Sequence, residues 1–285
     1  MVFHSVVAAL VSLVLAPIYD GIERKMRAAV HSRIGPPILQ TWYDIIKLFT
    51  KEIVVPLGGT WCALATVLEL IVLASSAVLL MFVAGIGLSP EGIFWVIVFT
   101  VLVSAASSLT ILRSVSQNNV YSVVGGFREF SLVLSAEPFL IMSLFLLASG
   151  AGSQISRAVA VATAIVASYV VSGRVPYDIA EAEPELSAGV NIELSGPLLG
   201  LATVSTVFKK FVSASLTSLV LVSLAGLSGW SSLAATFLLT PATWIAQLIL
   251  SVMLGRSRVD LAVKFLYTLL FTLSILTLLS YGLGL

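Results

Sequence analysis

Eight long apolar runs are the feature that most limits what this chain can fold into. A helix needs about 20 apolar residues to cross a bilayer. It also satisfies its own backbone hydrogen bonds, which lipid cannot do, so strands are disfavoured in such runs. The sequence therefore predicts an all-α, polytopic membrane protein. Its expected spans cover residues 2–19, 61–84, 92–112, 130–149, 154–172, 197–225, 231–253 and 261–283.

Composition agrees with a membrane location. Of the 285 residues, 59% are hydrophobic and only 10% are charged, whereas soluble domains carry about 25% charged residues. No repeat of fixed period and no linker is visible, so residues 1–285 are expected to form a single integral membrane domain. The first run lacks a basic stretch before it and a clear cleavage site, so we expect it to be kept as the first span.

The chain has few residues that could hold a redox centre. Cys62 is the only cysteine, and His4 and His31 are the only histidines. One thiol cannot hold an iron–sulfur cluster or a structural zinc ion. A net charge of +1 gives no argument for nucleic acid. We therefore expect no cofactor, metal or nucleic acid on this chain, and any redox centre would belong to another protein of a complex.

Basic residues concentrate in alternate connections between the expected spans, and such a bias predicts orientation. The connections on the other side hold only Arg157. We therefore expect a multi-pass protein of the cell membrane with both termini outside and the charged connections in the cytoplasm. The eleven basic residues on that side are Arg24, Lys25, Arg27, Arg33, Lys47, Lys51, Arg113, Arg128, Arg174, Arg256 and Arg258.

Residues 20–60 form a long charged segment after the first span. Gly35, Pro36 and Pro37 interrupt it, because proline lacks a backbone N–H and restricts the residue before it. The following stretch has apolar residues at helical spacing, which predicts an amphipathic helix along the membrane surface. Such a helix is either a surface anchor or one wall of a crevice at the membrane–cytoplasm boundary. Its apolar residues are Ile38, Leu39, Trp42, Ile45, Ile46 and Phe49.

Residues 173–193 hold an unusual concentration of acids between two apolar runs. Glu181, Glu183 and Glu185 alternate, so in an extended segment they would line one surface and would raise one another's pKa values. The segment is either a solvated acidic loop or a group of coupled titrating carboxyls, with Arg174 and Lys209 as candidate counter-ions. Asp178 and Glu193 complete the group.

Charged residues also interrupt the apolar runs themselves, where a charge costs roughly 2.5–3.5 kcal/mol on insertion scales. Glu69 either handles protons or bonds to a neighbouring protein of a complex. Glu137 precedes Pro138, which is expected to kink the helix and create a polar pocket. Lys209, with Lys210, either snorkels or pairs with a carboxylate. Lys264 either snorkels or pairs with Asp260, four residues earlier.

Several segments resemble, in order along the chain, the membrane protein shared by respiratory complex I, where it is called subunit 1 or the H subunit, and energy-converting nickel–iron hydrogenases. One signature matches Glu23, Arg24, Lys25, Arg33, Ile34, Gly35, Pro36, Gln40, Asp44, Lys47, Leu48, Lys51 and Glu52. A second matches Arg174, Pro176, Tyr177, Asp178, Glu181, Glu183, Glu185, Leu186, Gly189, Glu193, Ser195 and Gly196. Further matches are Gly126, Arg128 and Glu137, and the closing group Arg256, Arg258, Asp260 and Lys264.

The chain departs from complex I in ways that make it more similar to the hydrogenase type and related archaeal ferredoxin-driven complexes. Pro37 stands where complex I has asparagine, and Leu194 follows Glu193 where complex I has tyrosine. The chain is expected to be a non-redox subunit of an oxidoreductase complex.

The resemblance implies that residues 20–60 and 173–193 are cytoplasmic docking loops. They would contact a hydrogenase-large-subunit-like protein, which would hold any nickel–iron centre, and a small-subunit-like protein carrying iron–sulfur clusters. Antiporter-like and small membrane subunits would adjoin the chain in the bilayer. The docking residues would be Glu23, Arg24, Lys25, Arg33, Gly35, Pro36, Asp44, Lys47, Arg128, Arg174 and Pro176.

The resemblance also implies that this chain couples electron transfer on its partners to H⁺ or Na⁺ translocation. The alternatives are a quinone-site subunit of a complex I-type NADH or ferredoxin dehydrogenase, a secondary transporter, and a passive membrane anchor. A transporter predicts repeats and broken helices at mid-membrane. The coupling pathway would use Glu69, Glu137, Asp178, Glu181, Glu183, Glu185, Glu193, Lys209 and Lys264.

Overall fold

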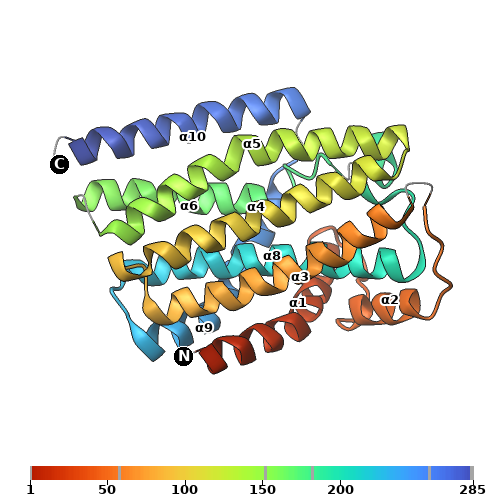
Figure 1. Cartoon of the computed structure of the whole chain (residues 1–285), viewed down its shortest axis with the longest axis horizontal. Coiled ribbons are helices and arrows are strands. Elements are labelled where there is room, and N and C mark those ends of the chain that lie inside the picture. Colours follow the sequence, from red (N-terminus) through yellow and green to blue (C-terminus); the bar gives the residue numbers. More distant parts are fainter. Residues whose placement is uncertain (1, 57–58, 151–152, 181–182, 256–257, 283–285) are drawn as a thin grey trace.

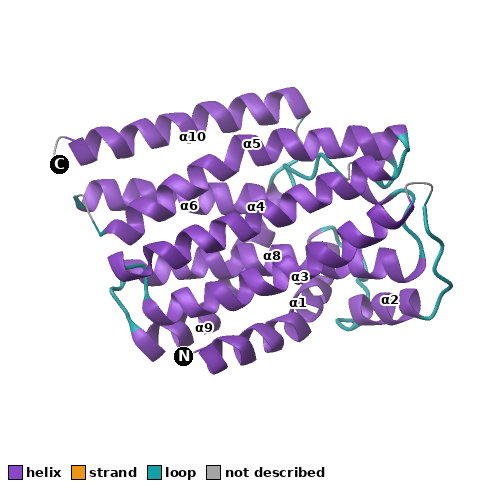
Figure 2. Ribbon diagram, in the orientation of Figure 1, coloured by secondary structure: helices purple, strands orange, loops and turns teal. Residues whose placement is uncertain are grey.

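Long α-helices make up nearly all of the computed structural model, which describes residues 2–56, 59–150, 153–180, 183–255 and 258–282. No strand occurs in these residues (Figure 2). Eight of their helices are long and apolar enough to cross a membrane, which confirms the predicted fold class. The elements are α1 Val2–Val30, α2 Gln40–Phe49, α3 Gly59–Ile86, η1 Pro90–Gly92, α4 Ile93–Ser116, α5 Val120–Ser149, α6 Gln154–Val171, α7 Glu183–Leu186, η2 Gly189–Asn191, α8 Gly196–Leu224, α9 Gly229–Met253 and α10 Val259–Gly282.

The long helices lie side by side in one bundle (Figure 1). Successive spans pack together from α3 to α6, α9 packs on α8, and α10 lies against α5 and α6. α8 is the most enclosed span: 72% of its apolar window is buried, against 50% or less in the others. Most of its side chains therefore face other helices. α2 and the described part of residues 172–195, which include the acidic segment, lie toward one end of the bundle (Figure 1). We call it the charged end.

Three helices extend beyond the apolar runs that predict them. α1 continues to Val30, so the first part of the expected 20–60 loop is helical. α4 contains Arg113 and α5 contains Arg128, although the apolar runs predict a loop at both positions. Only residues 117–119 connect these two helices. Apolar length reports the thickness of the hydrocarbon core, whereas a helix continues until its backbone bonding is interrupted.

The amphipathic helix predicted after Pro37 is confirmed as α2. Thr41 and Ile45 are buried, while Tyr43 and Ile46 are more than half exposed. The helix packs on α8 and α1. The approach to α1 is tight at Gly21, where an added Cβ would lie 1.7 Å from the carbonyl oxygen of Ile38. No larger residue fits there without moving the chain before α2.

The prediction that the acidic segment, residues 173–193, is extended is wrong. Glu183–Leu186 forms the short helix α7, so Glu183 and Glu185 do not alternate on one surface, and Glu181 lies outside the described residues. The neighbouring η2 packs on α5 and α4. At Gly125 of α5 an added Cβ would lie 2.7 Å from the carbonyl oxygen of Ala180. The segment is thus held against the helices instead of projecting into solvent.

Candidate functional site

Two consecutive lysines on α8 each reach a different carboxylate. Lys209 Nζ lies 2.7 Å from Glu129 Oε1 on α5. Lys210 Nζ lies 3.6 Å from Asp20 Oδ1 on α1. Neighbouring residues on a helix point about 100° apart, which explains the two directions. Because α8 is enclosed, the lysines pair inside the protein and do not snorkel; the paired alternative is confirmed.

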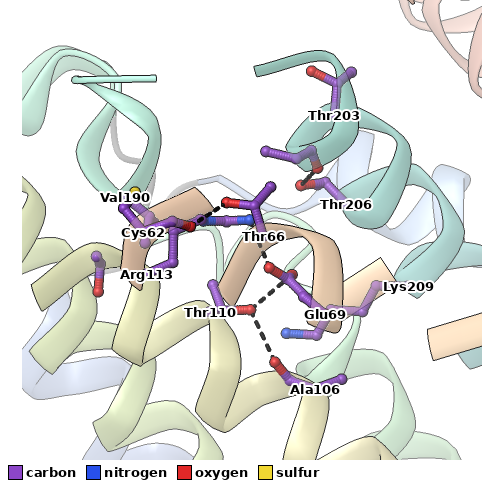
Figure 3. Close-up of polar contacts among 12 residues, drawn as sticks. Cys62, Thr66, Glu69, Ala106, Thr110, Arg113, Val190, Thr203, Thr206 and Lys209 are labelled. Carbon is purple, nitrogen blue, oxygen red and sulfur yellow. Dashed lines mark hydrogen bonds and ion pairs between the residues drawn. The ribbon is translucent and has the colours of Figure 1, made fainter. Parts of the chain in front are cut away.

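Glu69 of α3 has its partners on α4 of the same chain. Its Oε2 lies 2.6 Å from Arg113 Nη1, and its Oε1 accepts a hydrogen bond of 2.9 Å from Thr110 Oγ1. The side chains of Glu69 and Arg113 are only 4% and 1% exposed. In Figure 3, Lys209 points from α8 toward this group. A bond to another protein, one of our alternatives for Glu69, is not needed to satisfy this carboxylate.

A small cavity of about 50 Å³ lies between the two ion pairs. Its lining includes Glu69, Arg113, Glu129 and Lys209. A volume of that size holds about three water molecules. The buried Nε atom of Arg113 has no hydrogen-bond partner among the described residues, so it can donate to such a water. Burial raises the pKa of Tyr177, another lining residue, which stays protonated at neutral pH.

A second, larger cavity of about 390 Å³ adjoins the first toward α1. We call the two the inner and the outer cavity. Asp178 and Thr206 line both of them. Asp20, Glu23 and Lys210 also line the outer cavity, whose described lining is polar or charged except at Val207. A row of charged groups therefore extends from α1 to α3, with Asp178 and Thr206 at its middle.

Glu137 lies near this row, in the middle of α5. The residue is 6% exposed, and its Oε1 atom has no hydrogen-bond partner among the described residues. Its charged neighbours are Lys209 and Glu129, and the hydroxyls of Ser104 and Ser107 on α4 lie beside it. Pro138 lies inside α5, which continues through it to Ser149, and a kink at Pro138 stays a prediction. The polar surroundings of Glu137 come from α4, from α8 and from Glu129 on α5 itself.

Two of the expected docking residues are buried. Arg174 Nη1 lies 2.7 Å from Glu23 Oε2, with side chains 1% and 4% exposed. The guanidinium also lies 4.5 Å from the centre of the Trp244 ring on α9. Glu23 accepts a further hydrogen bond of 2.9 Å from Arg27. These contacts join α1, α9 and the 172–195 segment below the surface.

Other predicted docking residues are more accessible. Lys25, Arg33 and Lys47 are exposed, while Gly35, Pro36 and Pro176 are partly buried. Arg24 bridges α1 and α2, with its nitrogens 3.0 Å from Asp20 Oδ2 and 2.9 Å from Asp44 Oδ2.

The remaining predicted residues are spread over the charged end. Arg128 Nη1 lies 2.6 Å from Glu185 Oε2. Glu193 Oε1 accepts a hydrogen bond of 2.5 Å from Asn119. Lys264 is exposed, and Asp260 pairs with Arg258 at 3.3 Å instead of with Lys264. The side chain of Glu183, like Arg256, lies outside what the structure describes.

Sequence reasoning missed the partners of the predicted acids. Glu129, Thr110 and Asp20 were not singled out, and Arg113 was used only for orientation. Arg113 and Thr110 lie three residues apart on α4, so both can face Glu69. That spacing of an arginine and a hydroxyl near the end of an apolar run was the available signal. Glu129 gives no comparable signal, because its partner comes from α8.

The charged side chains of this site can take part in acid–base chemistry. Within the residues that the structure describes, no group of three or more His, Cys, Asp or Glu side chains is arranged to hold a metal ion. The buried carboxylates of Glu69 and Glu129, and Lys209, lie within hydrogen-bond distance of charged partners on neighbouring helices. Water in the cavities can carry protons between them.

Fold and site together define a multi-pass helical membrane protein with paired charges buried near one end. The model of the NADH dehydrogenase family matches residues 3–282. The chain belongs to this family, that of complex I subunit 1, and the resemblance read from the motifs is confirmed.

Named relatives include both hydrogenase and quinone-reductase components. Hydrogenase-4 component C of Escherichia coli (strain K12) is 32% identical, over 76% of this chain and 74% of its own length. Formate hydrogenlyase subunit 4 of the same organism is 28% identical, over 70% and 71%. The H subunit of NADH-quinone oxidoreductase from Geobacillus kaustophilus (strain HTA426) is 25% identical, over 97% and 92%.

A solved structure shares the fold. A chain of the membrane-bound sulfane sulfur reductase, an archaeal respiratory membrane complex, aligns with a TM-score of 0.79 at 20% identity. The alignment covers 98% of this chain and 99% of that one. The arrangement of spans described above is therefore shared along nearly the whole length of both chains.

Proposed function

We propose that this chain is the membrane subunit on which the peripheral arm of a hydrogenase-type complex docks, and that it couples electron transfer there to H⁺ or Na⁺ translocation. The iron–sulfur clusters and any nickel–iron centre belong to the peripheral subunits, and antiporter-like subunits adjoin this chain in the membrane. The 32% identity to a hydrogenase component supports the hydrogenase type.

The observation that carries the proposal is the row of buried charges joined by two polar cavities. Asp20 and Lys210 lie on the outer cavity, and Glu69, Glu129 and Lys209 on the inner one. Burying charges between membrane spans is costly, so such groups mark ion pathways. A change of charge at the docked redox centre would shift the protonation of the outer groups and, through them, of the inner ones.

The exposed charges at the same end support a docking role. Lys25, Arg33 and Lys47 are exposed on α1, α2 and their connection. Arg174 and Glu23 are buried, so in this proposal they hold the docking surface in place instead of contacting the partner. The excess of basic residues predicts that this end faces the cytoplasm, with the N-terminus outside.

A quinone site is the second candidate, because one relative is named as part of an NADH-quinone oxidoreductase. The outer cavity has the volume for a ligand, but almost all of its described lining side chains are polar or charged. Ligand pockets for apolar ring compounds are lined mainly by apolar side chains. The lining therefore favours water over a quinone. A secondary transporter is disfavoured too, because the described spans are continuous helices.

The decisive experiment is the Glu137→Gln substitution in the assembled complex. We expect ion transport in proteoliposomes to be lost while the peripheral arm stays bound and still reduces artificial acceptors. The matched control is Glu91→Gln, because Glu91 is exposed in η1, outside the charged row. Full ion transport by the Glu137→Gln complex would overturn the coupling role and favour a passive anchor.

A further inference from the structure

The short connection between α4 and α5 holds the end of the acidic segment through side-chain bonds. Gln117 is fully buried. Its Nε2 donates a hydrogen bond of 2.6 Å to the carbonyl oxygen of Val190, and its Oε1 accepts one of 3.2 Å from the backbone N–H of Glu193. One glutamine therefore satisfies both a backbone acceptor and a backbone donor of residues 190–193.

Asn119 strengthens the same attachment. Its Nδ2 donates a hydrogen bond of 2.5 Å to Glu193 Oε1, and its Oδ1 caps α5 by accepting 2.9 Å from the N–H of Tyr121. The connection is itself braced, because Ser122 Oγ donates 2.8 Å to the carbonyl oxygen of Ser114. Residues 190–193 are thus bonded to a rigid helix–helix corner and not merely packed on it.

This corner leads directly to the inner cavity. Gln117 is the C-cap residue of α4 and follows Arg113 by four residues, so it lies one helical turn beyond Arg113. Arg113 is the partner of Glu69 at 2.6 Å, and both are enclosed by the protein. A displacement of residues 190–193 therefore pulls on the end of α4 that carries Arg113. Buried, close-packed groups transmit such a displacement instead of absorbing it.

We propose that Gln117 is a positioning residue that links the acidic segment to the Glu69–Arg113 ion pair. This inference rests on the proposed function: when the docked arm moves the acidic segment, Gln117 carries the movement to Arg113 and changes how tightly Arg113 holds Glu69. Gln117 touches no transported ion. It acts through Arg113, and Thr110 is the second donor to Glu69.

The test uses the Gln117→Leu substitution in the complete membrane complex, with Gln154→Leu as control, because Gln154 is exposed at the start of α6. Loss of the bond to the Glu193 N–H should make its amide hydrogen exchange about tenfold faster. We expect ion transport per electron to fall by about half or more while the rate of acceptor reduction by the peripheral arm is unchanged.

A double-mutant cycle separates this role from a general loss of stability. Thr110→Val removes one donor to Glu69 without touching the corner. If Gln117 acts on Glu69, the effects of Thr110→Val and Gln117→Leu on ion transport per electron are not additive. Additive effects would contradict the proposal. An unchanged rate of amide hydrogen exchange at Glu193 in the Gln117→Leu variant would contradict it too.

The failure of this inference can be told from failure of the proposed function. If Gln117→Leu frees residues 190–193 but leaves ion transport per electron unchanged, while Glu137→Gln abolishes transport, only the link through Gln117 is wrong. If both variants transport ions at the level of the Gln154→Leu control, the coupling function itself is wrong.

Discussion

Two groups of buried polar side chains meet at α8, and they are satisfied in different ways. Toward the charged end, Glu69, Glu129, Arg113 and Lys209 find their partners on other helices. Farther along α8, hydroxyls dominate: Ser218 Oγ lies 3.2 Å from Thr240 Oγ1 of α9, and Ser168 Oγ lies 3.0 Å from Thr217 Oγ1.

The buried serine and threonine side chains depend less on their partners on other helices than the buried charged side chains do. Thr240 Oγ1 lies 2.8 Å from the carbonyl oxygen of Thr236 one turn earlier, and Thr217 Oγ1 lies 3.0 Å from that of Ser213. A hydroxyl that loses its partner on the next helix still has a bond on its own helix. A buried charge that loses its partner has no such substitute. Each buried charged side chain therefore needs its partner on another helix, which we call mutual dependence. The serine and threonine side chains mainly allow the helices to pack closely.

The largest expected effect is that of Arg113→Met. It leaves Glu69 buried with only Thr110 as a donor, and breaking a buried ion pair costs about 3–5 kcal/mol. The loss should be seen as a lower free energy of unfolding in mixed detergent–SDS micelles. Adding Glu69→Gln should recover part of the stability, because no buried charge is then left unpaired. A double variant as unstable as Arg113→Met would contradict mutual dependence.

A smaller effect is expected for Arg174→Met. Glu23 keeps its hydrogen bond to Arg27, so its charge stays compensated, and the loss is that of one charged hydrogen bond, about 1.5–3 kcal/mol. The same unfolding measurement applies. Trp244→Leu also removes the ring beside the guanidinium, but it takes away the packing on Tyr19 and Phe211 too, so it is not a matched control. If Arg174→Met destabilised the chain as much as Arg113→Met, Arg27 would not be compensating Glu23.

The smallest effect is expected for Thr240→Val. It removes the contact with Ser218, and interhelical hydrogen bonds in membrane proteins contribute about 0.6 kcal/mol on average. Valine keeps the shape of threonine, so packing of α9 on α8 should persist. A loss above roughly 2 kcal/mol in the same micelle titration, well beyond that range, would erase the distinction between the two groups.

Much of the fold could be predicted because the length of each apolar run depends only on the residues within that run. Each span needs only its own residues to be apolar over the width of a bilayer, and the spacing of Trp42, Ile45 and Phe49 suffices for α2. Helix ends were less predictable. Arg113 and Arg128 end the apolar runs but not the helices. Arg113 is buried against Glu69, whereas Arg128 is partly exposed and pairs with the exposed Glu185.

The candidate site was predictable only in part, for a related reason. Glu69, Glu137 and Lys209 stand out because charge is rare in apolar runs. The motifs at 20–60 and 173–193 mark the charged end, yet they do not reveal that Glu23 and Arg174 bond to each other below its surface. The acidic segment was expected to be extended, whereas close packing on α5 at Gly125 and bonding to Gln117 shape it into short helical turns.

The membrane class, the spans, the amphipathic helix and the residues of unusual charge could thus be predicted from local patterns in the sequence. Which charges pair depends on tertiary packing. Lys209 and Lys210 are adjacent in sequence, but α8 directs one to Glu129 on α5 and the other to Asp20 on α1. Pairing depends on which helices enclose α8, and that arrangement is set by packing among segments far apart in the chain.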